Sequence, residues 1–501
     1  MISLNGGLAM KASVKLSVND TISPVDERIY SSFIEHMGRA VYTGIFEPGH
    51  STADENGLRQ DVIDLIKPLS LPLIRYPGGN FLSGYRWEDG IGPKKNRPRR
   101  LDLAWQALEP NTFGTDEFMD FCEKAGTAPM MGVNLGTGTP QNAADLVEYC
   151  NFPGGTHYSD QRIKNGHEKP YGIKTWCLGN EMDGPWQICA KTAEEYATIA
   201  RESAKMMKLV DPSIELVACG SSNKEMPTFG TWERTVLRGC WEHIDYLSLH
   251  QYYRNDDGDL PTFLARNLEM DSFIKEVADI CREVKKEKNS DKDIFLSFDE
   301  WNVWYHWQNN KMESEPWTVG RRVEEEEYNF ADALAVGCLI NTLINNADTV
   351  KIACLAQLVN ALSAIMTEPD GGAWAQTIYY PFALASQNGR GTALKASVDC
   401  DTYSCAVSDA VPYLDVSAVC SSDGKTISVF AVNRSTDEDI ECNLTIAQGA
   451  KLISHTALSG FDLNAVNTIA SSPVAPAEIP AGDKLTLPAA SWNMLKYEVN
   501  A

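Results

Sequence analysis

The chain has 501 residues, enough for about three domains of typical size, or for two if one of them is a large α/β barrel. Hydrophobic residues make up 43% and charged residues 22%, with 36 Gly and 24 Pro, so the disordered, collagen-like and coiled-coil classes are excluded. The 44 Lys and Arg against 68 Asp and Glu give a net charge of −24 at pH 7, which argues against nucleic acids and anionic membranes as partners.

Two features bear on the cellular compartment. The 13 cysteines are odd in number, form no CxxC pair and lie mostly in apolar runs, as reduced core cysteines do. The N-terminal residues lack a basic segment followed by an apolar one, and the longest apolar run, 333–344, is too short to cross a bilayer. We therefore expect a cytoplasmic protein in which residues 1–9 form a leader before the patterned chain.

Eight short apolar runs, each suited to a buried strand, alternate with amphipathic helical patterns. The expected strands are 29–35, 71–76, 129–135, 173–179, 214–220, 244–250, 294–299 and 350–356. The expected helices are 58–69, 115–125, 142–149, 193–209, 231–238, 263–287 and 323–345. This alternation predicts the α/β class and a (β/α)8 TIM barrel. An open doubly wound sheet is the competing fold, but no GxGxxG motif follows an early strand.

The pattern changes after about residue 388, where short alternating runs such as 425–432, 442–446 and 484–487 are separated by turn signals. These runs predict an additional β-sandwich, jelly-roll-like domain. Residues 11–19 alternate in the same way and are expected to pair with it. The expected division is a leader at 1–9, an N-terminal sandwich strand at 10–25, the catalytic barrel at 26–388 and the sandwich at 389–501.

In a TIM barrel the active site lies at the C-terminal ends of the strands. Most of the expected strands end in or near carboxylates, amides, histidines or aromatics, which are Glu35, His36, Asn80, Asn134, Asn180, Glu181, His250, Tyr252, Asp299, Glu300 and Gln357. Amides and carboxylates hydrogen-bond hydroxyl groups, and aromatic rings stack on the C–H faces of sugars. The strand ends therefore suit a polyhydroxylated substrate.

Glu181 and Glu300 end the fourth and seventh expected strands, and each is flanked by Asn and near a Trp. A single Glu in such a place is often only a salt-bridge partner, whereas two of them match the pair of carboxyl groups that glycosidic cleavage needs. A separation of about 5 Å would indicate a retaining mechanism, and one of about 8 Å an inverting mechanism.

Other chemistries lack their motifs. No HxH or HExxH spacing indicates a metal site, and neither a GxSxG elbow nor a P-loop occurs, so we expect no metal and no cofactor. His36 and His250 are expected to position substrate or orient a carboxylate, with a purely structural role as the alternative.

Four segments carry a family resemblance. They are FIEHMG at 33–38, RYPGGNF at 75–81, GNEMDGPW at 179–186 and DEWNVWY at 299–305. Together they closely resemble the α-L-arabinofuranosidases of glycoside hydrolase family 51, and the match extends from about Lys11 to the C-terminus. The resemblance implies a retaining, exo-acting enzyme that needs no cofactor and releases terminal non-reducing α-L-arabinofuranosyl residues from arabino-oligosaccharides. It also implies a homo-oligomer, commonly a hexamer.

The resemblance assigns roles to individual residues. It implies Glu181 as the general acid/base, which we expect to hold its proton through partial burial and the negative charge of Glu300, and Glu300 as the nucleophile. Asn180 would hold the 2-hydroxyl group, Arg75 would keep Glu300 ionised, and His250 would support the site. The furanose would contact Glu35, Asn80, Tyr252 and Gln357, between the walls Trp105 and Trp304. Thr43-Gly44 stands where relatives often have Gly-Gly, which leaves the leaving-group preference open.

Two alternatives remain open at this point. The first is an endo-acting β-glucanase or a xylosidase of the same family. The second is a non-catalytic carbohydrate-binding protein that uses its sandwich. Of the 12 tryptophans only Trp492 lies after residue 388, so an aromatic sugar platform in the sandwich has little support.

Overall fold

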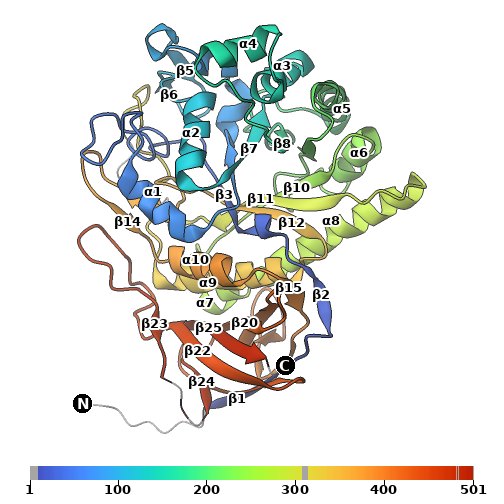
Figure 1. The fold of residues 1–501 in the computed structure, drawn as a ribbon. Helices are drawn as coiled ribbons and strands as arrows, with labels where there is room; N and C mark the ends of the chain where they lie inside the picture. The colour runs from blue at the N-terminus through green and yellow to red at the C-terminus, as the bar shows by residue number, and fades with distance from the viewer. Residues whose placement is uncertain (1–8, 307–313, 481, 483, 500–501) are drawn as a thin grey trace.

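The computed structural model describes residues 9–306, 314–480, 482 and 484–499, so most of the expected leader lies outside the described residues. Eight parallel strands close into a barrel, which confirms the predicted fold class (Figure 1). In barrel order they are β3 (Ser31–Phe33), β4 (Leu73–Tyr76), β7 (Ala128–Val133), β8 (Thr175–Leu178), β9 (Glu215–Ala218), β10 (Tyr246–Tyr253), β11 (Phe295–Val303) and β12 (Val350–Leu355). Each overlaps one of the eight apolar runs.

The α-helices of the described residues are α1 (Gln60–Ile66), α2 (Thr115–Ala125), α3 (Pro140–Asn151), α4 (His157–Lys164), α5 (Ala193–Val210), α6 (Thr231–Cys240), α7 (Leu260–Leu264), α8 (Asn267–Glu287), α9 (Phe330–Asn345) and α10 (Tyr379–Asn388). Local signals explain many of their ends. The Thr192 side chain accepts a hydrogen bond from the backbone of Glu195 at the start of α5, and Gly126 ends α2 at a φ of 73°.

Three expected elements were wrong in part. The strand at 29–35 is only Ser31–Phe33, because Asp26 caps a 3₁₀ turn over Glu27–Tyr30. The helix at 263–287 is two helices, since α7 ends at a cap on Ala265 before α8 begins. The helix at 323–345 begins at Phe330, where Asn329 and Asp332 form a capping box, so residues 323–329 are not helical. Helices α4 and α10 were not predicted.

Two packed sheets follow the barrel. The larger sheet has seven strands, in the order β2 (Thr21–Pro24), β15 (Thr392–Leu394), β19 (Leu414–Cys420), β20 (Thr426–Asn433), β25 (Ser491–Val499), β22 (Ala450–Leu458) and β23 (Ala477–Glu478). The smaller sheet has four, in the order β16 (Ser397–Cys400), β1 (Met10–Leu16), β21 (Ile440–Ile446) and β24 (Leu485–Leu487). Apolar residues from both sheets form one buried cluster between them. Strand β1 pairs with β21 and β16, and β2 pairs with β15, so the N-terminal segment lies in these sheets.

Helices α9 and α10 lie between the barrel and the seven-stranded sheet, where α9 contacts β19 and β20 (Figure 1). Because α9 packs against protein on both sides, nearly all of its residues are buried. Short hairpins complete the described chain: β5 (Arg100–Asp102) with β6 (Ala107–Glu109), β13 (Ile365–Thr367) with β14 (Ala373–Ala375), and β17 (Thr402–Tyr403) with β18 (Val411–Pro412). All 13 cysteines are unpaired, and no helix within the described ranges is both long and apolar enough to cross a membrane.

Candidate active site

Backbone geometry brings the two predicted glutamates to the same end of the barrel. Glu181 follows β8 on a sharp turn, with a φ of 88° at Gly179 and of 45° at Glu181 itself. Glu300 lies within β11, directly paired with His250 of the neighbouring strand β10. A positive φ at a residue other than glycine is unfavourable and often marks a functional position. The strained turn thus directs the Glu181 side chain toward the neighbouring strand ends.

The two carboxylates are close together. One oxygen of Glu181, one of Glu300 and one ring nitrogen of His250 all lie within 4.8 Å of one another. Retaining glycosidases hold their carboxyl groups about 5–5.5 Å apart, whereas inverting enzymes leave room for a water molecule at about 6.5–9.5 Å. The spacing here therefore fits a nucleophile and a proton donor rather than an inverting pair.

His250 links three carboxylates. Its Nδ1 lies 3.0 Å from Glu181 Oε1 and 3.6 Å from Glu300 Oε2, and its Nε2 lies 3.0 Å from Asp299 Oδ1. Burial would lower the pKa of His250, but the negative charges around it outweigh burial and raise the pKa to about 10. At neutral pH the ring is therefore an imidazolium that donates from both nitrogens. A protonated Nδ1 has no lone pair to offer a metal ion.

Glu300 is buried and held by donors on both of its oxygens. Arg75 Nη2 lies 2.9 Å from Oε2, and the Tyr252 hydroxyl group donates to Oε1 at 2.7 Å. Burial raises the pKa of Glu300 above its usual value, and Glu181 adds to this, while His250 and Arg75 oppose it. The expected proximity of Arg75 to Glu300 is thus present, although burial outweighs its effect on the Glu300 pKa.

Two further residues of this centre were given no role from the sequence. The indole Nε1 of Trp186 donates to Glu181 Oε2 at 2.6 Å, and Asp299 holds the far side of the His250 ring. Burial opposes ionisation of Asp299, but Arg75 and His250 keep its pKa below the usual value. Trp186 and Asp299 lie in the motifs at 179–186 and 299–305, so their closeness in sequence to Glu181 and Glu300 could have indicated a role.

Glu35 lies in a buried cradle. The backbone N–H of Phe81 and the indole N–H of Trp105 donate to its Oε1, and Gln357 Nε2 donates to its Oε2 at 3.2 Å. Burial raises the pKa of Glu35 to about 8, although these donors favour the charged form. Gly79 makes the cradle possible, because a Cβ there would lie 1.9 Å from Glu35 Oε2.

The remaining predicted residues fall around this centre. Trp304 packs edge-on against Tyr252 with ring centroids 5.1 Å apart. The amide oxygen of Asn180 accepts from Arg75 Nη1 at 3.1 Å. Asn80 begins a 3₁₀ turn, Asn80–Gly84, and is partly exposed.

Two polar residues from the strand ends have structural partners instead. His36 is buried between Glu109, 2.7 Å from its Nδ1, and the Tyr76 hydroxyl group, 2.8 Å from its Nε2. Asn134 donates to the backbone of Tyr85, and its oxygen accepts N–H groups of its own turn at 136–138. Their polar groups are occupied by the fold, so neither offers a free contact to a sugar.

Comparison with known proteins gives a consistent picture. The family model described as "Alpha-L-arabinofuranosidase 1 domain" matches residues 65–272, and the model described as "Alpha-L-arabinofuranosidase C-terminal domain" matches residues 299–491. The chain is 55% identical to an intracellular exo-α-(1→5)-L-arabinofuranosidase of Bacillus subtilis, over 91% of this chain and 92% of the relative. It is 48% identical to an exo-α-(1→6)-L-arabinofuranosidase of Bifidobacterium longum, over 89% and 88%.

Solved structures agree with this similarity. A family 51 α-L-arabinofuranosidase from Bifidobacterium longum superposes with a TM-score of 0.93 at 42% identity, covering 98% of this chain and all of that one. An α-L-arabinofuranosidase from Thermotoga maritima, solved as an arabinose complex, gives a TM-score of 0.86 at 34% identity, with 98% and 100% covered.

Proposed function

The chain belongs to the α-L-arabinofuranosidases of glycoside hydrolase family 51 and is an exo-acting glycosidase, and we propose that Glu300 and Glu181 carry its reaction as nucleophile and general acid/base. The observation that supports this assignment most strongly is the separation of the two carboxylates, within 4.8 Å, at the C-terminal ends of barrel strands β8 and β11. A non-catalytic sugar-binding protein, the alternative from another class, would not need two carboxyl groups at this distance.

The first step is displacement of the leaving sugar. A Glu300 oxygen attacks C1 of the terminal arabinofuranosyl residue, the bond from C1 to the leaving oxygen breaks, and Glu181 gives that oxygen its proton. Two hydrogen-bond donors and the His250 charge favour the ionised form of Glu300, which is the form that attacks C1.

The second step reverses these roles. Glu300 is neutral once it is esterified, and Glu181, now ionised, removes a proton from the water that attacks C1. The bond from C1 to the Glu300 oxygen breaks, which releases arabinose and restores the Glu300 carboxylate. The second inversion restores the original anomeric configuration, so the enzyme is retaining. Asn180, Tyr252, Glu35 and Gln357 are proposed to hold the furanose between the walls Trp105 and Trp304, with Asn80 at the edge of the pocket.

The roles of the two glutamates are separable by experiment. Glu300→Ala is expected to abolish release of arabinose from every substrate. Glu181→Ala is expected to retain activity only on aryl arabinofuranosides with good leaving groups, and to form an arabinofuranosyl azide when azide is added. The assignment is wrong if both variants keep near-normal rates on an unactivated oligosaccharide.

The substrate is proposed to be an arabino-oligosaccharide, attacked at its terminal furanose. Two relatives are named for different linkages, (1→5) and (1→6), so the preferred linkage has to be measured. Release of arabinose from linkage-defined oligosaccharides, with NMR of the first anomer formed, measures both linkage and stereochemistry. Shortening of linear β-glucan from internal sites would instead favour the endo-acting alternative.

Compartment, assembly and domain division are proposals of the same kind. A cytoplasmic location is supported by the relatives named intracellular and by the unpaired cysteines. A homo-oligomer, with a hexamer as the expected form, is proposed and is tested by light scattering on the purified chain. The boundary at 388/389 is supported by the end of α10 at Asn388 and the start of β15 at Thr392.

A further inference from the structure

One short segment contacts both tryptophans that wall the proposed sugar pocket. We call residues 321–326 the strap. Arg321 Nη1 donates to the backbone oxygen of Trp105 at 3.2 Å, and Val323 is buried in the same small apolar cluster as Met37, with Trp105 packed against it. On the other side the indole Nε1 of Trp304 donates to Glu324 Oε2 at 3.0 Å. The strap therefore connects two walls that come from distant parts of the chain.

Glu324 occupies an unfavourable backbone conformation. Its φ is 51°, in the left-handed region that favours Gly and Asn, and its backbone oxygen accepts the N–H of Leu362 at 2.9 Å. A Glu at such a position needs a compensating contact, and such strain concentrates at functional sites. The charge-assisted hydrogen bond from Trp304 is a contact of that kind.

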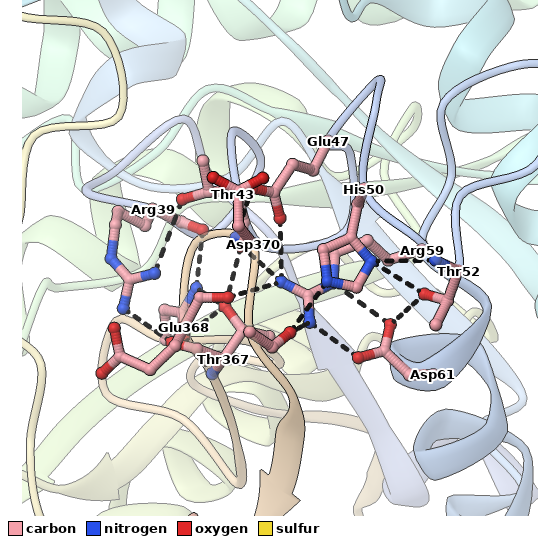
Figure 2. A network of polar contacts seen from close by, with 12 residues as sticks. Arg39, Thr43, Glu47, His50, Thr52, Arg59, Asp61, Thr367, Glu368 and Asp370 are labelled. Atoms are coloured by element: carbon pink, nitrogen blue, oxygen red, sulfur yellow. Dashed lines mark hydrogen bonds and ion pairs between the residues drawn. The ribbon is translucent and has the colours of Figure 1, made fainter.

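The strap is anchored from behind by buried charges. Arg39 grips Glu325 with two parallel hydrogen bonds, Nε to Oε1 at 2.6 Å and Nη2 to Oε2 at 2.9 Å, and Arg322 adds a third at 2.9 Å. Arg39 Nη2 also donates to the backbone of Thr367. Figure 2 shows Arg39 and Thr367 within a larger network in which Arg59 and Glu47 join the loop after β3 to the turn at 367–371.

These contacts restrict the conformation of Glu324. Its hydrogen bond from Trp304 in turn restricts the orientation of the Trp304 indole. The Trp304 ring in turn packs on Tyr252, whose hydroxyl group contacts the proposed nucleophile. Glu324 also lines a cavity of about 690 Å³ together with Tyr305 and Trp374, a size that is adequate for part of an oligosaccharide. Trp304 thus lies between the reacting centre and a carboxylate that faces additional space.

We propose that Glu324 is a positioning residue that holds the Trp304 indole as the platform for the leaving saccharide, and so favours oligosaccharides over compact substrates. This inference rests on the proposed function of the site. The indole face binds the leaving sugar equally in the ground state and in the transition state, so loss of its orientation raises KM and leaves kcat unchanged.

The test compares two variants on two substrates. Glu324→Gly removes the carboxylate while accepting the positive φ, and Glu324→Gln keeps an oxygen that can accept from Trp304. For an α-(1→5)-linked arabinotriose, Glu324→Gly is expected to raise KM about tenfold with kcat within about twofold, the size of effect that one charge-assisted hydrogen bond supports. Glu324→Gln restores most of the affinity. With α-L-arabinofuranosyl fluoride, which has no leaving sugar, Glu324→Gly is expected to raise KM clearly less than for arabinotriose, because Trp304 then contacts the furanose alone.

A double-mutant cycle identifies the path of the effect. Trp304→Phe removes the indole N–H, so adding Glu324→Gly to it is expected to change the KM for arabinotriose no further. The proposal is overturned if Glu324→Gly lowers kcat on both substrates equally, or if its effect persists in the Trp304→Phe background. Failure of the proposed function looks different, because the parent enzyme would then release arabinose from neither substrate.

Discussion

Removal of the His250 charge is expected to change how stability depends on pH. The pKa of this histidine is about 10 in the folded protein against 6.5 for an ordinary histidine. Between these values the folded chain holds a proton that the unfolded chain has lost, so the stability from His250 is fully present below pH 6.5 and disappears as pH rises through 10. One such proton makes the free energy of unfolding fall by about 1.4 kcal/mol per pH unit, or by about 5 kcal/mol over the 3.5 units.

The assay compares the parent protein with His250→Gln by urea unfolding at pH 8.0 and 9.5, followed by tryptophan fluorescence, which reports mainly on the barrel because 11 of the 12 tryptophans precede residue 389. Groups that titrate in this range away from His250 are common to both proteins and cancel in the difference. The gap in unfolding free energy between the two is expected to narrow by about 2 kcal/mol over this interval.

His455 provides a matched control. It is buried in the sheet domain, where its Nε2 donates one hydrogen bond to Asn493 Oδ1, and burial lowers its pKa. His455→Gln is therefore expected to leave a constant gap from pH 8.0 to 9.5. If the gap for His250→Gln is equally constant, the histidine is not held as a cation by the three carboxylates, and the charge arrangement argued for the active site is refuted.

Three further outcomes are expected. Gly79→Ala places a Cβ on the Glu35 carboxylate, so it should lower Tm and lower kcat/KM for an aryl arabinofuranoside by more than about 100-fold. A Gly79→Ala variant with normal activity would contradict the close approach of Gly79 to Glu35. Glu35→Gln sets an amide N–H against that of Gln357 and should raise KM about tenfold with a smaller effect on kcat, which steady-state kinetics measures. Iodoacetamide should modify Cys189 first in the native chain, because this cysteine is exposed, and mass spectrometry identifies the modified residue. Equally rapid modification of a buried cysteine would contradict the packing of the barrel and the sheets.

Local sequence patterns were sufficient where local forces decide the structure. The barrel strands follow from apolar runs, and Glu181 and Glu300 from their place at strand ends. The helix expected at 323–345 shows the limit of such patterns, because four consecutive glutamates before an apolar run are compatible with a helix. Long-range contacts, among them the two hydrogen bonds from Arg39 to Glu325, hold these residues in a different conformation. Contacts between residues almost 300 positions apart leave no periodic signal in the sequence.

For the same reason, local patterns placed the polar residues of the site at strand ends but did not predict the contact between His250 and Asp299. Arg75 comes from β4, His250 from β10, and Asp299 and Glu300 from β11, so their ionic balance exists only once the barrel has closed. The two cations lie against the two carboxylates of β11, with Arg75 Nη2 2.9 Å from Glu300 and His250 Nε2 3.0 Å from Asp299. Closure of the barrel therefore collects polar side chains from distant strands and also brings together the two positive charges that keep the pKa of Asp299 below its usual value.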